Sequence, residues 1–116
     1  MIDLIADRVW LAPGATDMRK SIDGLAALVK HGMGREPTEP AIFVFCGRRR
    51  DRIKLLYWDV NGFWLLYKRL EGGRFRWPPL GTEAVLLTRR QLAWLLDGLQ
   101  VEQRQAHRPV KATVVA

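Results

Sequence analysis

The chain has 116 residues, a length that suits one domain burying roughly two thirds of its unfolded surface. Hydrophobic residues make up 48% and charged residues 27%, as is ordinary for a globular protein. No apolar run approaches the roughly 18 residues of a membrane helix, and the acidic start MIDLIADR lacks the basic segment of a secretion signal. We therefore expect a soluble, cytoplasmic protein without a membrane partner. The net charge of +7 makes nucleic acid the first partner to consider.

A strand and a helix are predicted in the first third of the chain. The sequence RVWLA at residues 8–12 predicts a short strand, which ends at Pro13 and Gly14. A helix is predicted near residues 18–32, because apolar residues recur there at intervals of four, three and four and so form one helix face. These residues are Met18, Ile22, Leu25 and Val29.

Residues 42–77 have the pattern of an antiparallel β-meander of about four strands. Runs of β-branched, aromatic and leucine residues of strand length are separated by three turn signals. The turn signals are the charged segment 47–51, the segment 59–62 with Gly62 in the left-handed position, and the pair Gly72-Gly73. This meander, with two α-helices packed on it, gives a predicted α+β fold.

The turns also predict the register of the meander. The expected cross-strand pairs are Trp58 with Trp64, Leu56 with Leu66, Lys54 with Lys68, Phe75 with Leu70, and Arg76 with Arg69. One face of the sheet would then hold Leu56, Trp58, Trp64, Leu66, Leu70, Phe75 and Trp77. Arg69, Arg74 and Arg76 would lie on the other face, where the like-charge pairs are destabilising unless an anion lies over them.

The last third of the chain contains a turn, a strand and a helix. Two prolines and Gly81 form a turn after Trp77, and residues 83–87 suit a short strand. The sequence Thr88-Arg89-Arg90-Gln91 matches a capping box at the start of a helix over residues 89–98. Residues 1–100 are therefore predicted to form a single α+β domain, and residues 101–116, which show no periodicity, a flexible tail.

Most of the positive charge lies in the predicted meander. Between Phe43 and Trp77 there are nine basic residues and three acidic ones, which is +6 of the chain's +7. Basic side chains between flat aromatic rings suit a polyanion with stackable bases, although a solvated strand edge would also be rich in Lys and Arg. The candidate nucleic-acid contacts are Arg48, Arg49, Arg50, Arg52, Lys54, Lys68, Arg69, Arg74 and Arg76, with Trp58 and Trp64 as stacking rings. We expect Trp10, Trp77 and Trp94 in the core.

Residues with the spacing of a catalytic or metal site are missing from the sequence. The two histidines, His31 and His107, do not combine with Cys46 into a metal-ligand pattern. Asp51, Asp59 and Glu71 lie at turns, where making the turn is the commoner role of such residues. The chain also has no Gly-Lys-Ser/Thr phosphate loop. We therefore expect no enzymatic activity, no metal and no cofactor.

Three motifs in order closely resemble the accessory proteins of IS66 insertion sequences, the products of the second open reading frame, often called TnpB. The motifs are TDMRKSIDGLAALV, then FVFCGRRRDRIKLLYWDVNGFWLLYKRLEGGRFRWP, then LTRRQLAWLLDGL, and the resemblance covers about residues 8–101. It implies a small protein that is encoded beside a larger transposase and is needed for efficient transposition. It supplies no catalytic residue to carry over.

Two functions remain open at this point. In the first, the basic meander binds DNA, either the element's ends or the target, to assist the transposase. In the second, the protein is an adaptor that docks on the transposase or on itself through a strand edge or the second helix. The aromatic and arginine content suits both, because Trp and Arg are also enriched at protein interfaces.

Overall fold

The computed structural model describes residues 6–79 and 81–102, and it confirms an α+β fold. Five strands form one sheet, in the order β4-β3-β2-β1-β5. They are β1 (Arg8–Leu11), β2 (Ala41–Cys46), β3 (Arg52–Asp59), β4 (Gly62–Arg69) and β5 (Val85–Leu87). The helical elements are α1 (Ile22–Ala27), which continues into the π-helical turn η1 (Leu28–Gly32), and α2 (Arg89–Leu96).

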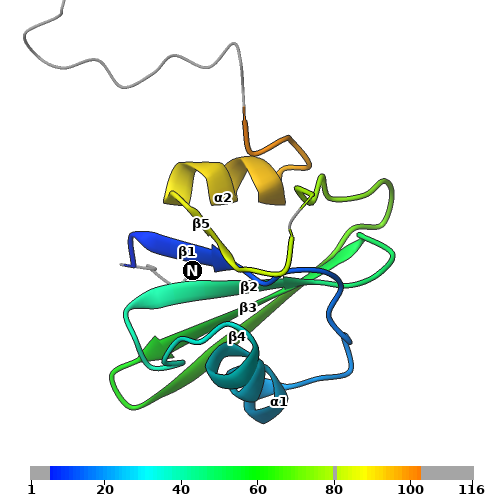
Figure 1. Cartoon of the computed structure of the whole chain (residues 1–116). Coiled ribbons are helices and arrows are strands. Elements are labelled where there is room, and N and C mark those ends of the chain that lie inside the picture. The colour runs from blue at the N-terminus through cyan, green and yellow to red at the C-terminus, as the bar shows by residue number, and fades with distance from the viewer. Residues whose placement is uncertain (1–5, 80, 103–116) are drawn as a thin grey trace, which may run out of the picture.

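The sheet is covered on both faces. Helix α1 lies below it and α2 above it in Figure 1. On the α1 side, Leu25 and Val29 pack with Phe43, Phe45 and Leu56. On the α2 side the core is larger and holds Val9, Leu11, Ile42, Val44, Ile53, Leu55, Phe75, Leu92 and Leu95. All six residues of β2 are buried, as expected for a central strand packed on two faces.

The long β2-β3-β4 hairpins form as predicted, and β1 joins them in a way that local patterns do not indicate. β1 pairs in parallel with β2, through the crossover that contains α1 and η1, and β5 pairs antiparallel with the other side of β1. Helix α2 begins with the predicted capping box. Thr88 Oγ1 accepts from the Gln91 amide at 3.1 Å, and Gln91 Oε1 accepts from the Thr88 amide at 2.9 Å.

The predicted fourth strand of the meander is wrong. After β4, residues 70–79 contain no strand. The amide of Leu70 donates to Asp51 O at 2.8 Å and that of Phe75 donates to Arg50 O at 2.6 Å, so this segment bonds to the β2–β3 loop instead of to β4. Leu70, Phe75 and Trp77 then pack on the α2 side of the sheet, which the eight-residue α2 covers only in part.

The predicted register between β3 and β4 is also wrong, by one residue. Asp59 pairs with Gly62, so the loop holds only Val60 and Asn61, and Val60 takes the positive φ (51°) expected for Gly62. Because a slip of one residue exchanges the faces of a strand, β4 is inverted relative to the prediction. The observed pairs are Trp58 with Phe63, Leu56 with Leu65, Lys54 with Tyr67, and Arg52 with Arg69.

The first helix is shorter than predicted. Met18 lies in a turn before α1, where Asp17 pairs with Arg19 at 2.8 Å. The helix begins at Ile22. Leu25 of α1 and Val29 of η1 are fully buried, while Met18 and Ile22 pack against the same cluster from partly exposed positions. Of the predicted tail, Val101 packs at the edge of the core, and residues 103–116 lie outside the described residues.

Candidate nucleic-acid interface

Seven of the nine predicted basic residues meet at one end of the sheet. The β2–β3 loop (residues 47–51) and the segment after β4 (residues 70–76) are joined there by the two backbone hydrogen bonds from Leu70 and Phe75. Both segments lie at the right-hand end of the sheet in Figure 1. We call this surface the arginine end; its members are Arg48, Arg49, Arg50, Arg52, Arg69, Arg74 and Arg76.

The backbone of the β2–β3 loop fixes where its arginines lie. Gly47 N–H donates to Arg52 O at 3.0 Å, and Arg50 N–H donates to Gly47 O at 3.0 Å, which closes a tight turn. Arg50 takes the left-handed conformation, with φ of 64°. A Cβ on Gly47 would lie 2.8 Å from Met18 Cγ, so this position accepts a larger residue only if Met18 shifts. The conformation of the loop is therefore fixed by its own hydrogen bonds and by its packing against Met18.

The arginines of the arginine end differ in how many hydrogen bonds and ion pairs their side chains make within the protein. Arg69 pairs with Glu71 at 2.9 Å, and this carboxylate raises the pKa of the Arg69 guanidinium. Arg50 donates to Gly14 O at 3.4 Å, and Arg52 Nε is buried without a hydrogen-bond partner. Of the seven arginines of the arginine end, four are exposed and make no side-chain hydrogen bond or ion pair with any described residue; they are Arg48, Arg49, Arg74 and Arg76.

The two predicted lysines are engaged within the protein. Lys54 Nζ donates to Met18 O at 2.7 Å and to Lys20 O at 2.8 Å, and so ties the turn before α1 to the sheet. Lys68 Nζ donates to Leu96 O at 2.8 Å at the C-terminus of α2, where a cation also interacts favourably with the helix dipole. Neither ammonium group belongs to the free charge of the arginine end.

The two candidate stacking rings lie at the opposite end of the β3–β4 hairpin. From Arg52 to Trp58 the strand advances about 20 Å, at roughly 3.3 Å per residue. Trp58 packs edge-on against Phe63, with ring centroids 5.0 Å apart. Trp64 is 45% exposed and donates from Nε1 to Asp59 Oδ2 at 3.2 Å. The predicted set of arginines and tryptophans is therefore divided between two distant surfaces.

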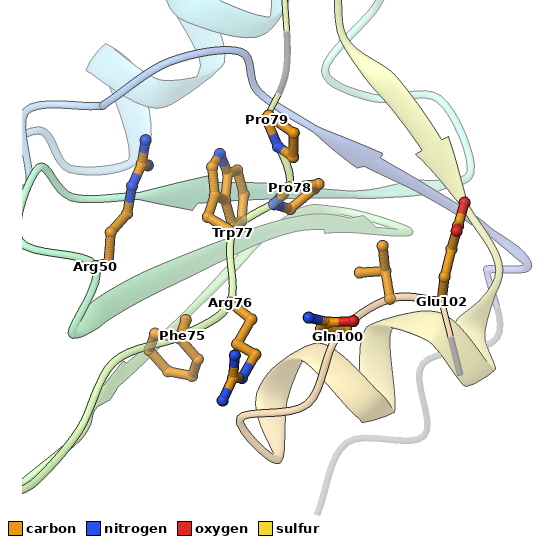
Figure 2. A pocket seen from close by; sticks show the side chains of 9 residues that line it. Arg50, Phe75, Arg76, Trp77, Pro78, Pro79, Gln100 and Glu102 are labelled. Carbon is orange, nitrogen blue, oxygen red and sulfur yellow. The ribbon is translucent and has the colours of Figure 1, made fainter. Parts of the chain in front are cut away.

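Trp77, which the sequence places in the core, is the aromatic ring that lies at the arginine end. It is half-buried, and the Arg50 guanidinium lies 5.9 Å from its ring centroid. It lines a pocket of about 570 Å³, shown in Figure 2, between residues 75–79 and residues 100–102. The sequence carries a signal for this position, since Trp77 directly follows Arg76 and precedes two prolines. The other two rings expected in the core, Trp10 and Trp94, are also half-buried.

Within residues 6–79 and 81–102, no three His, Cys, Asp or Glu side chains come together as a metal site would need. Cys46 is fully buried, and this burial raises the pKa of its thiol, so the reactive thiolate is disfavoured. No helix in the same part of the chain is both long enough and apolar enough to cross a membrane. His107 falls outside the described residues.

Comparison with known proteins gives a consistent set of similarities. The family described as IS66 Orf2 like protein matches residues 7–106. The uncharacterized protein y4hO of Sinorhizobium fredii is 38% identical over 105 residues, which cover 90% of this chain and 91% of that protein. The uncharacterized protein y4jC of the same organism is 35% identical over 107 residues, covering 90% and 92% respectively. No solved structure matches the chain.

Proposed function

Because the chain belongs to the IS66 Orf2-like family, and so has an accessory role in transposition, we propose that it binds DNA without catalysis through the arginine end. The observation that carries this proposal is the convergence of guanidinium groups from two separate segments at one end of the sheet, four of them without a partner among the described residues. The bound DNA would be an insertion-sequence end or the target, held in the cytoplasm for the transposase.

Several like charges at one end of a small domain repel one another, so their gathering has an energetic cost. Arginine is well suited to phosphate, because its planar guanidinium can donate two parallel hydrogen bonds. Protection of a sheet edge does not account for these charges. The edge strands are β4 and β5, whereas Arg48, Arg49, Arg74 and Arg76 all lie outside the strands. A polyanion that bridges the two segments supplies the missing partner.

Two triple variants with the same change of charge test the proposal. The first, Arg48→Ala/Arg49→Ala/Arg74→Ala, removes free charge from the arginine end. The control, Arg8→Ala/Lys30→Ala/Arg89→Ala, removes exposed charge elsewhere, since Arg8 begins β1 and Arg89 begins α2 at the far end of the sheet. Affinity for element-end and scrambled duplexes is measured by fluorescence anisotropy across a salt series.

The first variant should reduce the slope of log affinity against log salt by about 0.9 for each phosphate that is no longer bound, on either duplex. The control should keep the wild-type slope, apart from a small effect of net charge. Both variants should unfold within about 0.5 kcal/mol of the wild type, because the substituted side chains are exposed. Equal slopes for the two variants would overturn the proposal.

One observation favours the alternative function, an adaptor that docks on the transposase or on a second copy of the chain. β4 is an eight-residue outer strand of the sheet, and it carries Trp64 and Tyr67 at 45% and 53% exposure. An exposed edge of this length can accept a strand from a partner. An adaptor without direct DNA contact would give the same salt slope for both triple variants, so the salt series separates the two functions.

A further inference from the structure

The pocket beside Trp77 has the volume of a small-molecule site and is open to solvent on one side. At about 570 Å³ it lies within the size range of ligand pockets, which is roughly 300–1,000 Å³. Its walls are the extended segment 75–79 and the chain that follows α2, with Arg50 reaching in from the β2–β3 loop. Figure 2 shows Arg50 on one side of the Trp77 ring, and Gln100 and Glu102 on the other. An aromatic ring, two prolines and several polar side chains therefore surround one hollow.

We propose that this pocket receives one unpaired nucleobase of a DNA strand whose phosphates lie on the arginine end; this inference rests on the proposed DNA binding. Arg50 and Arg76 belong both to the pocket wall and to the arginine end, so a backbone held by the arginines passes the mouth of the pocket. Aromatic rings next to cationic grooves are the usual platforms for unpaired bases. The half-buried Trp77 ring and the flat prolines beside it offer such a platform.

The polar residues of the pocket predict which base is preferred. The Glu102 carboxylate can accept a hydrogen bond from an exocyclic amino group, as carboxylates do from cytosine N4. Thymine has no amino group to donate, and its carbonyl oxygen would face the carboxylate. The pocket should therefore favour cytosine over thymine. The Arg50 guanidinium, 5.9 Å from the centroid of the Trp77 ring, helps to hold that ring in place.

The same residues fit a peptide less well. A proline-rich or acidic peptide could also lie against Trp77, because such segments dock in aromatic grooves. The pocket, however, opens beside free guanidinium groups on the arginine end and carries Glu102 on its far wall. That carboxylate would repel an acidic peptide, whereas it can pair with the amino edge of a base. The chemistry of the walls thus favours a nucleotide.

The experiment compares a blunt duplex with the same duplex carrying a one-nucleotide overhang. The overhang is cytosine, thymine or an abasic sugar, and the abasic probe keeps the phosphate while removing the base. Full-length wild-type protein should bind the cytosine probe about 5- to 150-fold more tightly than the abasic probe, which is the range that base stacking on an aromatic ring gives. Cytosine should also bind more tightly than thymine.

Two variants locate the effect. Trp77→Leu should abolish the difference between the cytosine and abasic probes, with both affinities compared with the affinity of the same variant for the blunt duplex. Since Trp77 also packs on the core, its folding is checked by thermal unfolding, and Glu102→Gln serves as a second variant at an exposed position. Glu102→Gln should reduce the discrimination between cytosine and thymine and retain the stacking gain.

The outcomes distinguish this inference from the function on which it rests. Equal affinity of the wild type for the cytosine and abasic probes, with normal blunt-duplex binding, would overturn the base pocket and leave DNA binding intact. The same result together with loss of transposase capture by Trp77→Leu would assign the pocket to a protein partner. Absence of binding to every probe would overturn both proposals.

Discussion

The two ends of β3 show how differently one basic, aromatic stretch of sequence is used. At the start of the strand, the two segments of the arginine end are joined to each other by backbone hydrogen bonds from Leu70 and Phe75. At its finish, the hairpin tip (residues 58–64) bonds mainly to itself, through Trp64 with Asp59 and Trp58 with Phe63. The arginine end is charged and is formed by two segments of the chain, whereas the hairpin tip is aromatic and is formed by one.

The region between the two ends explains why they differ. Lys54 and Lys68 lie on the strands themselves and donate to backbone carbonyls of the turn before α1 and of α2. The arginines at the start of β3 have few such acceptors near them, so most of their charge remains free for a ligand. Cations that are adjacent in the sequence therefore fall into two groups, those that hold the fold together and those that face outward.

Lys54→Met should have the largest effect on stability and sharpens this division. It keeps the aliphatic stem but removes the ammonium bonded to Met18 O and Lys20 O. Because hydrogen bonds to charged groups contribute about 1.5–3 kcal/mol, we expect a loss of that size in the free energy of unfolding, measured by urea denaturation. The matched control, Arg48→Met, should change stability by less than about 0.5 kcal/mol.

The same pair of variants should behave in the opposite way toward DNA. Arg48→Met should lower the salt slope of binding, while Lys54→Met should leave it unchanged. A lower slope for Lys54→Met at full folding would show that this lysine contacts phosphate after all. If Arg48→Met lost as much stability as Lys54→Met, the distinction between cations that hold the fold together and cations that face outward would not hold.

What the sequence could predict here was local. The capping box of α2 and the strand-length apolar runs of β2 and β3 depend on residues close together in the chain, and the helix cap and both strands are present in the structure. The parallel pairing of β1 with β2 joins residues more than thirty positions apart, as in Arg8 with Ala41, and no local pattern encodes it. The same reason hides the role of Lys54, whose acceptors lie more than thirty residues earlier.

The candidate site was predictable in composition and not in arrangement. The arginines were identified from charge alone, but their union depends on the segment 70–76 leaving the sheet, where a fourth strand was expected. Trp58 and Trp64 lie in the same stretch of sequence as the arginines, but β3 places Arg52 and Trp58 about 20 Å apart, at roughly 3.3 Å per residue. Trp77 comes next to Arg50 only through this tertiary contact.

A residue with positive φ that is not glycine lies next to each end of β3: Arg50 before it and Val60 after it. Val60→Asn tests whether the backbone at the hairpin tip is strained. Val60 has φ of 51° and is 88% exposed, and Asn61 N–H donates to Asp59 O around it. A β-branched residue is disfavoured in this conformation, whereas Asn adopts it readily. Val60→Asn should therefore raise the free energy of unfolding by about 1 kcal/mol, read from urea denaturation, with no change in DNA affinity.

Arg50 is the matching position at the arginine end, with φ of 64°. Its side chain reaches Gly14 O and the Trp77 ring, and Arg50→Asn removes both interactions. The same substitution should therefore give no gain in stability at this end. If Arg50→Asn were more stable than the wild type, the side-chain interactions of Arg50 would not offset its backbone strain. If Val60→Asn were less stable, the backbone at Val60 would not be strained.

Lys68→Met should have the smallest effect on stability. It tests whether Lys68 belongs with the cations that hold the fold together or with those that face DNA. Lys68 Nζ is exposed and donates to Leu96 O at the end of α2, so its loss should cost about 0.3–1 kcal/mol in the free energy of unfolding. Because an exposed charge is screened by salt, this cost should shrink as ionic strength rises in the urea experiment. If Lys68 belonged to the DNA surface instead, Lys68→Met would leave stability unchanged and lower the salt slope by about 0.9.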